Sequence, residues 1–464
     1  MCAYAAENLR KKWFTGEEHT KMKLNIPSGA EIILNTLEQH GYEAYVVGGC
    51  VRDSILGRCP DDWDITTSAS PEQVKALFRR TVDTGLQHGT VTVLIEKEGF
   101  EVTTYRVDGD YEDGRHPKEV RFTSNLKEDL KRRDFTINAM AYHPERGLVD
   151  LFGGVNDMEK KVIRCVGDPM ERFQEDALRI LRAVRFSAQL GFTIEARTKE
   201  AIGALAPNLK LVSAERIQVE LVKLLVSPNP DYLRAAYETG VTAEFLPEFD
   251  VCMKTDQNTP HHCYTVGEHI LKSLLHVRAD KVLRLTMLLH DIGKPVVKTT
   301  DENGRDHFKM HGPESEQMAK AILRRLKFDN DTIHKVFRLV KWHDARPAAQ
   351  MPNVRRSVNK IGEDIFPLYL EVQRADMLAQ STYQRREKEE RLEGVKSCYE
   401  QIVEKKQCVS LKSLAVTGRD LIQAGYKPGP HLGEILDQLL EHVLEYPEDN
   451  QKETLMQLVK EYQD

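Results

Sequence analysis

The stretch EAYVVGGCVRDSILGRCPDDWDITT, residues 43–67, decides how the N-terminal part of the chain folds. A β-branched run ends in Gly48 and Gly49, residues of helical character follow, and a second β-branched run closes the stretch. This order predicts a strand, a glycine turn, a helix and a second strand. Glycines at such a turn let a phosphate approach free backbone N–H groups, although an ordinary strand-to-helix connection is the commoner use of two glycines.

Two aspartates, Asp62 and Asp64, stand at the start of the second run. Alternation along a strand predicts that both carboxylates lie on one face, with Trp63 and Ile65 on the other. Neighbouring carboxylates repel each other unless a cation lies between them, and Mg²⁺ is commonly bound by a few carboxylates together with substrate phosphates. The pair therefore predicts a magnesium site. Glu101, which opens the strand EVTTYR, is a candidate third ligand, with a strand-edge residue as the alternative.

Secondary-structure patterns divide the chain into an α/β part and a helical part. Between residues 43 and 150, short β-branched runs alternate with turns. The pattern predicts a helix at PEQVKALF and strands at EAYVVGG, DWDITT, GTVTVLIE, FEVTTYRV and FTINAMAYH. Beyond Asp168, apolar residues recur at spacings of three and four, as in residues 168–191 and 214–227, which predicts helices for nearly all of the remainder.

Composition sets bounds on size and partners. A chain of 464 residues predicts about two to four packing units. A formal net charge of −6 predicts that any nucleic acid is held by local basic groups rather than by a global positive field. The N-terminal residues lack a signal-peptide core and no run is apolar enough to span a bilayer, which predicts a cytoplasmic protein with no membrane partner. The eight cysteines lack paired spacing and are expected to be reduced thiols.

Several motifs follow the glycine turn and the aspartate pair in a fixed order. They are EVTTYR at 101–106, DGRHP at 113–117, RRDFTIN at 132–138 and EDALR at 175–179. Over roughly residues 43–226 this order resembles the bacterial class II CCA-adding tRNA nucleotidyltransferase and poly(A) polymerase family of the polymerase-β superfamily. The resemblance implies an α/β nucleotidyltransferase head, a small mixed sheet with helices, followed by an all-α neck, an HD-containing body and a tail. The implied boundaries are 24–160 for the head, 161–228 for the neck, 229–385 for the body and 386–464 for the tRNA-contacting tail.

The same resemblance assigns catalytic and nucleotide-binding residues. Asp62 and Asp64 would bind Mg²⁺, with Glu101 as the less certain third carboxylate, in a two-metal in-line transfer of a nucleotide to an RNA 3′-OH. Guanidinium groups match phosphate geometry, although each arginine has a surface ion pair as its alternative use. The expected nucleotide-binding residues are Gly48, Gly49, Arg52, Arg132, Asp134, Asn138, Asp176, Arg179, Arg182 and Arg185.

Selection of the base is predicted from the EDALR element. A continuous helix would place Asp176 and Arg179 three residues apart on one face. A carboxylate accepts from the exocyclic amine of C or A and a guanidinium donates to a ring nitrogen, whereas the carbonyl oxygens of U and G would be repelled. The pair predicts selection of CTP and ATP without a nucleic-acid template. An ordinary Asp–Arg pair on a helix surface is the alternative.

The product is predicted from a loop. Family members that add only CC resemble the others but have a shortened loop, whereas residues 108–117 are intact here. The sequence therefore favours CCA addition, with an A-adding enzyme or a poly(A) polymerase as alternatives. The expected partners are tRNA, ATP and CTP, not DNA, and the expected state is a monomer or a homodimer.

A second group of residues lies in the C-terminal half. The run LLHDIGKP, with its adjacent His290 and Asp291, resembles the HD phosphohydrolase superfamily. The resemblance implies a site that hydrolyses phosphate esters with Ni, Mn, Fe, Zn or Mg. A helical scaffold that positions tRNA is the alternative for this site. For the whole chain, an RNA-binding scaffold whose only activity is the HD hydrolase is the alternative to a transferase. His269 is expected to be a core residue or a support for a ligand. The implied ligands are His262, His290, Asp291 and Asp376, with His311 and His343 for a second metal.

Overall fold

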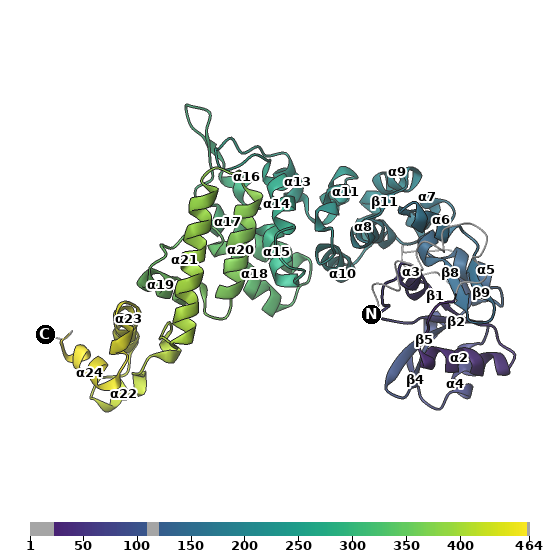
Figure 1. The fold of residues 1–464 in the computed structure, drawn as a ribbon, viewed down its shortest axis with the longest axis horizontal. Coiled ribbons are helices and arrows are strands. Elements are labelled where there is room, and N and C mark those ends of the chain that lie inside the picture. Colours follow the sequence, from purple (N-terminus) through teal and green to yellow (C-terminus); the bar gives the residue numbers. More distant parts are fainter. Residues whose placement is uncertain (1–22, 109–119, 462–464) are drawn as a thin grey trace. The chain divides into compact units, whose positions relative to one another are not determined.

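The computed structural model describes residues 23–108 and 120–461. The chain divides into two compact units, which follow each other in sequence at Phe245 and Leu246 (Figure 1). This division falls inside the body predicted at 229–385, and the four-domain boundaries stay predictions. Most of the loop at 108–117 lies outside the described residues, as does the N-terminal segment before residue 23.

The first unit begins with a seven-stranded sheet in the order β3-β4-β5-β2-β1-β8-β9. The central pair β2 and β5 is parallel, and the other pairs are antiparallel. Helices α2 and α4 pack on this sheet (Figure 1). The strands are β1 (Ala44–Val47), β2 (Ile65–Thr67), β3 (Thr81–Gly85), β4 (Thr90–Ile95), β5 (Glu98–Thr104), β8 (Met140–His143) and β9 (Gly147–Asp150). The helices are α2 (Ser28–Gln39), α3 (Gly49–Ile55), α4 (Pro71–Leu77), α5 (Leu126–Lys131) and α6 (Gly154–Glu159).

Two short stretches differ from the strands predicted by sequence. Asp62 and Asp64 precede β2, which begins only at Ile65, so the carboxylates project from the chain that enters the strand. The predicted strand FTINAMAYH is formed only in its second half, because residues Thr136–Asn138 make a 3₁₀ turn. The side chain of Asp134 accepts hydrogen bonds from the Phe135 backbone N–H at 2.9 Å and from Asn138 at 3.1 Å. Such local bonds compete with strand pairing.

The first unit also has two small two-stranded sheets, β6 (Arg106–Asp108) with β7 (Val120–Phe122) and β10 (Val162–Ile163) with β11 (Thr193–Ile194). Its remaining elements are mostly helices. The helices are α7 (Pro169–Glu175), α8 (Leu178–Leu190), α9 (Ala196–Leu205), α10 (Ala214–Leu225), α11 (Leu233–Glu238) and α12 (Thr242–Phe245). Helix α10 packs on α8, so the amphipathic pattern predicted at 214–227 is confirmed as a helix.

The single helix predicted over residues 168–191 is wrong, because the chain breaks at Asp176. This residue has extended backbone, with φ −141° and ψ 103°. Its carboxylate accepts from the Leu178 N–H at 3.0 Å and binds Arg216 at 2.8 Å. These bonds favour a break over a continuing helix. Asp176 and Arg179 therefore do not share one face of a continuous helix.

The second unit is helical apart from the short hairpin β12 (Thr299–Thr300) and β13 (Asp306–His307). Helices α14, α15, α17, α18 and α20 pack on one another, and α19 and α21–α24 enclose a further apolar core that includes Val358, Val395 and Leu439 (Figure 1). The helices are α13 (Pro247–Met253), α14 (Val266–Leu274), α15 (Lys281–Leu289), α16 (Lys294–Val297), α17 (His311–Arg325), α18 (Asn330–Trp342), α19 (Met351–Ile361), α20 (Phe366–Ala379), α21 (Arg385–Glu404), α22 (Gly418–Gln423), α23 (Pro430–Glu445) and α24 (Lys452–Glu461).

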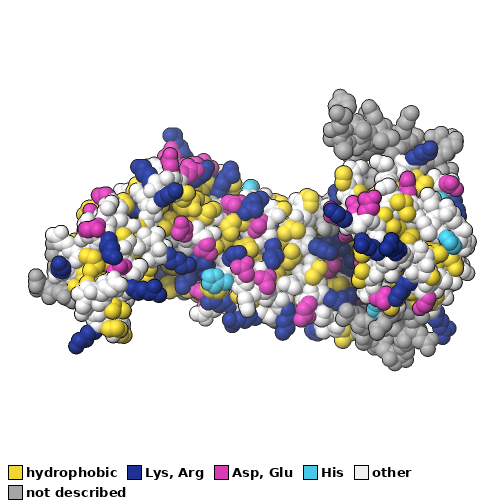
Figure 2. Space-filling model, turned by 90° about the horizontal axis from the view of Figure 1, so that it is seen from below, with side chains coloured by type: hydrophobic (Ala, Val, Ile, Leu, Met, Phe, Trp, Pro, Cys, Tyr) yellow, Lys and Arg dark blue, Asp and Glu magenta, His cyan; other side chains and the backbone are white. Residues whose placement is uncertain are grey.

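An α/β head with a mixed sheet followed by a helical body confirms the predicted fold class. On the face in Figure 2, basic side chains are interspersed with acidic ones. Among the described residues, no helix combines the length and apolar character that crossing a membrane requires.

Candidate functional site

Three carboxylates gather where β2 and β5 run side by side. Ile65 pairs with Val102 in parallel register, so Asp64 and Glu101 occupy equivalent positions one residue earlier on the two chains. Burial raises the pKa of Asp64, the charges of Glu101 and Asp62 raise it further, and Arg133 opposes them. Asp62 and Glu101 are exposed, and Asp64 is half-buried. Three neighbouring carboxylates repel one another, and a bound divalent cation that prefers oxygen ligands would relieve this repulsion.

The glycine turn opens onto a cavity of about 770 Å³. Gly48 has a φ of +83°, a left-handed conformation that favours glycine. A Cβ at this position would lie 3.0 Å from Nη1 of Arg133. The turn therefore needs glycine for its backbone and for the approach of an arginine. The lining includes Gly48, Gly49, Arg52, Asp62, Asp64, Arg133, Asp134, Asn138, Arg182, Arg185 and Phe186.

A chain of hydrogen bonds fixes two cavity arginines. Arg52 Nη1 donates to Asn138 Oδ1 at 2.6 Å, and Asn138 Nδ2 donates to Asp134 Oδ1 at 3.1 Å. Arg182 Nη2 lies 2.6 Å from Asp134 Oδ2. Burial acts to raise the pKa of Asp134, but the charge of Arg182 and the bonds from Asn138 and Arg182 outweigh it and hold this pKa well below its usual range. The two arginines are thus held in place by contacts within the protein.

Three residues predicted to bind nucleotide do not line this cavity. Arg132 pairs with buried Asp129 at 2.7 Å. Asp176 binds Arg216, and Arg179 donates to the Arg132 backbone oxygen at 3.0 Å and to Glu175 at 2.5 Å. Their contacts in this structure support the local fold.

Phe186 also lines the cavity, but it was not among the residues predicted from the sequence. Phe186 lies on α8 under the Arg185 guanidinium, whose carbon is 3.6 Å from the ring centroid. Arg52 and Arg182 lie 5.0 and 5.3 Å from the same centroid. A cation above the face of an aromatic ring is attracted by the quadrupole of the ring. The helical spacing of Arg182 and Phe186 was the signal that could have identified this residue.

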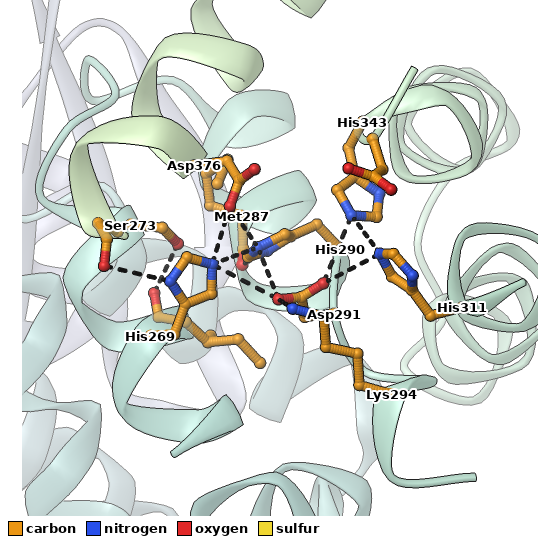
Figure 3. A network of polar contacts seen from close by, with 12 residues as sticks. His269, Ser273, Met287, His290, Asp291, Lys294, His311, His343 and Asp376 are labelled. Carbon is orange, nitrogen blue, oxygen red and sulfur yellow. Dashed lines mark hydrogen bonds and ion pairs between the residues drawn. The ribbon is translucent and has the colours of Figure 1, made fainter. Parts of the chain in front are cut away.

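A buried group of metal-binding side chains occupies the second unit (Figure 3). His269 Nε2, from α14, lies 2.9 Å from Asp376 Oδ1, 3.2 Å from His290 Nε2 and 3.5 Å from Asp291 Oδ2. His290 Nδ1 is 2.8 Å from the Met287 carbonyl oxygen, which leaves Nε2 to face the group. Two imidazoles and two carboxylates converging away from water fit a divalent transition metal.

The other oxygen of Asp291 faces a second pair of histidines. His311 Nε2 and His343 Nε2 lie 3.5 and 3.4 Å from Asp291 Oδ1 and 3.1 Å from each other. Their Nδ1 atoms face the Phe308 and Val340 carbonyls, at 2.8 and 2.6 Å. Asp291 therefore joins two donor groups, an arrangement that fits two neighbouring divalent cations.

The structure changes the place of two histidines. The sequence analysis put His262 among the ligands and left His269 outside, whereas the structure brings His269 into the group. His262 precedes α14, with its ring centroid 5.0 Å from that of His269. Burial lowers its pKa to about 2, and its buried Nδ1 has no hydrogen-bond partner within the described residues. His262 lines a cavity of about 330 Å³ beside the group.

Lys294 also lines this cavity. Its Nζ lies 2.7 Å from Asp291 Oδ2 and donates to Gln257 at 2.9 Å. Burial acts to raise the pKa of Asp291, but the positive environment of His290 and Lys294 holds it well below its usual range. An ionised carboxylate is the form that binds cations.

Family models match three parts of the chain. The poly A polymerase head domain matches residues 44–164, the "Probable RNA and SrmB- binding site of polymerase A" matches 191–253, and tRNA nucleotidyltransferase domain 2 matches 309–459. The first match contains the acidic cluster and the glycine turn. The third contains His311, His343 and Asp376.

Relatives match nearly the whole chain. The CCA-adding enzyme of Levilactobacillus brevis is 38% identical over 432 residues, 93% of this chain and 96% of that protein. The CCA-adding enzyme of Limosilactobacillus reuteri strain DSM 20016 is 35% identical over 434 residues, 93% of this chain and 96% of that protein. Among solved structures, the Bacillus stearothermophilus CCA-adding enzyme in complex with CTP has a TM-score of 0.68 and 30% identity, covering 95% of this chain and 98% of that one.

Proposed function

Since the chain belongs to the class II CCA-adding enzyme family, we propose that it adds C, C and A to the 3′ end of tRNA from CTP and ATP. The observation that carries the proposal is the acidic cluster of Asp62, Asp64 and Glu101, two of whose members line the cavity opened by the glycine turn. A module that only bound RNA would gain nothing from acids placed beside phosphates.

The proposed reaction is an in-line displacement at phosphorus. The RNA 3′ oxygen forms a bond to the α-phosphorus, the bond to pyrophosphate breaks, and the hydroxyl proton passes to solvent. Asp62, Asp64 and Glu101 would hold Mg²⁺, which supplies charge stabilisation for the attacking and leaving oxygens. Arg52, Arg182 and neighbouring cavity arginines would orient the triphosphate, because their side chains are already fixed by internal hydrogen bonds.

We retain Asp176 and Arg179 as the proposed base-reading pair, under one condition. Asp176 must leave Arg216 and Arg179 must leave Glu175, so the break between α7 and α8 would rearrange when nucleotide binds. Substitution of either residue should then relax the choice of C and A over U and G more than it lowers total incorporation.

The test uses tRNA transcripts that end before CCA, after C, and after CC, with Mg²⁺ and each nucleoside triphosphate. Ordered addition of C, C and A that then stops supports CCA addition. A single A added only to the CC-ended transcript would identify an A-adding enzyme, and unlimited A on any RNA would identify a poly(A) polymerase. No extension under any condition would overturn the transferase proposal.

We propose as a second function that the histidine–aspartate group hydrolyses phosphate esters. Its support is the shared position of Asp291 between two donor groups. The metals proposed are Ni, Mn, Fe, Zn or Mg, which would polarise the phosphoryl group. Water oxygen joins phosphorus, the ester bond breaks, and the leaving oxygen takes a proton. Metal content and hydrolysis of a nucleotide phosphomonoester test this function, and a metal-free, inactive protein would favour a purely structural body.

A further inference from the structure

A fully buried carboxylate, that of Asp129, bonds both to β2 and to the two arginines that follow α5. Its Oδ1 accepts from Arg132, with Nε at 3.0 Å and Nη2 at 2.7 Å. Its Oδ2 accepts from Arg133 Nη2 at 3.4 Å and from Thr66 Oγ1 at 3.1 Å. Thr66 lies in β2, two residues after Asp64. A single carboxylate oxygen therefore joins Arg133 to the strand that Asp64 precedes.

The other end of the Arg133 side chain reaches the cavity of the first unit. Arg133 lines this cavity together with Gly48 and Asp64. Its Nη1 lies at the glycine turn, 3.0 Å from where a Cβ on Gly48 would be. Its Nε is buried and has no hydrogen-bond partner within the described residues. A guanidinium that is bonded on one side and still has donors available can bind a phosphate oxygen.

Asp129 itself does not line the cavity, so it would not contact a bound nucleotide. Burial acts to raise the pKa of Asp129, but the charges of Arg132 and Arg133 outweigh it and hold this pKa below its usual value. The carboxylate is therefore ionised, and its bonds to the guanidinium groups are charge-assisted. Fixing a long side chain before a ligand arrives lowers the entropy cost of binding. Asp129 is thus suited to hold Arg133 ready for a phosphate.

We propose that Asp129 is a positioning residue, which holds the Arg133 guanidinium at the glycine turn so that it binds the triphosphate of the incoming nucleotide beside Asp64. This inference rests on the proposed transferase function and deepens it. Because Thr66 shares Oδ2 with Arg133, the same carboxylate sets where the phosphate-binding cation stands relative to β2. CTP and ATP carry the same triphosphate, so the binding of both depends on Asp129.

The test measures nucleotide binding without RNA, and therefore without transfer. Equilibrium dialysis of labelled CTP against the full chain in Mg²⁺ gives the dissociation constant. Arg133→Gln should weaken binding about thirtyfold, as expected for a lost hydrogen bond between charged groups, and Asp129→Asn about tenfold. The double variant should also bind about thirtyfold more weakly, because Asp129 acts only through Arg133. The affinity for ATP should change by the same factors.

Asp157→Asn is the matched control for loss of a buried carboxylate. Asp157, on α6, also accepts from a threonine and an arginine, Thr136 at 2.7 Å and Arg164 at 3.1 Å, and it does not line the cavity. This variant should lower the melting temperature as Asp129→Asn does, but it should change the affinity for CTP by less than about twofold.

A second variant keeps the test decisive if Asp129→Asn does not fold. Thr66→Val removes one hydroxyl and keeps the charge of Asp129, so it should weaken CTP binding about threefold in the wild type and not at all in Arg133→Gln. An equal loss in both backgrounds would overturn the positioning role.

The remaining outcomes separate this inference from the transferase proposal. A double variant of Asp129 and Arg133 that binds about three-hundredfold more weakly would show independent effects and overturn the inference. A loss in Asp157→Asn as large as that in Asp129→Asn would overturn it as well. If the effects combine as expected but the wild type extends no tRNA transcript, Asp129 positions a nucleotide-binding arginine and the transferase proposal fails.

Discussion

The acidic cluster of the first unit and the histidine–aspartate group of the second differ in how far the protein assembles them. Asp62 and Glu101 are exposed, and the three acids are not among the described groups whose ligand atoms already lie within 4.8 Å of one another. His269, His290 and Asp291 form such a group and are almost wholly buried. This difference agrees with the two proposals, in which substrate phosphates would complete the first site and the protein's own donor atoms would hold a metal at the second.

The chemistry of the ligands agrees with this difference. Mg²⁺ keeps much of its hydration and is usually shared between a few carboxylates and substrate phosphates. Imidazole-rich sites favour transition metals and bind them without substrate. The two sites should therefore lose function independently and in different assays.

The largest expected effect is on nucleotide addition. Asp62→Ala should lower the rate of addition roughly a thousandfold, because charge stabilisation at a phosphoryl centre contributes several kcal/mol. The same variant should leave the metal content of the second unit unchanged. Gel-resolved extension and elemental analysis of one preparation measure both quantities.

Asp61→Ala is the matched control for this variant. Asp61 is the exposed neighbour of Asp62 and also lines the cavity, but it is not among the charges that act on Asp64. Addition should stay within about threefold of wild type, as expected for an exposed charge. A thousandfold loss in both variants would contradict the assignment of Asp62.

The next effect distinguishes His269 from His262. His269→Ala should lower metal affinity in the second unit about a hundredfold, because its Nε2 faces three other donor atoms. His262→Ala should have a clearly smaller effect. Competition with a chromogenic chelator measures both affinities. The reverse order of effects would restore the assignment made from sequence, and tRNA extension should be normal in both variants.

These histidines also show what sequence patterns could and could not predict. The adjacent His290 and Asp291 were noticed through the resemblance of LLHDIGKP to the HD superfamily. The parallel register of β2 and β5 places Asp64 beside Glu101, as the predicted carboxylate cluster required. The choice between His262 and His269 depends on where α14 begins, because only His269 lies on this helix, and the spacing of seven residues does not encode that start. His269 is one of the buried residues of α14.

The helix break at Asp176 could not be predicted from the local sequence pattern, for a similar reason. Residues 168–191 have helical periodicity throughout, but the partner that holds the Asp176 carboxylate is Arg216, 40 residues away. Tertiary hydrogen bonds routinely override helix propensity. The overall architecture, by contrast, could be predicted from the spacing of apolar residues. Alternating apolar residues mark the buried face of a strand, and apolar residues three and four apart mark the buried face of a helix.

The last expected effect is on the free energy of unfolding, and it concerns how the buried cations of the first unit are balanced. Arg182 is paired with Asp134, and Arg185 is paired with Glu220. Asp134→Asn should therefore destabilise the first unit by about 2–4 kcal/mol, because it leaves a half-buried arginine without its partner. Urea unfolding at pH 7 measures the change.

The sign of its pH dependence follows from the lowered pKa of Asp134. A carboxyl group whose folded pKa lies below its unfolded value stabilises the protein above the unfolded pKa, near 4, and this contribution is lost as pH falls toward the folded pKa. The difference between wild type and Asp134→Asn should thus shrink by about 1 kcal/mol between pH 7 and pH 3. A difference that stays constant or grows would mean that Asp134 acts by packing and hydrogen bonding rather than by charge, and that the arginines of the cavity are held by Glu220 and Phe186 instead.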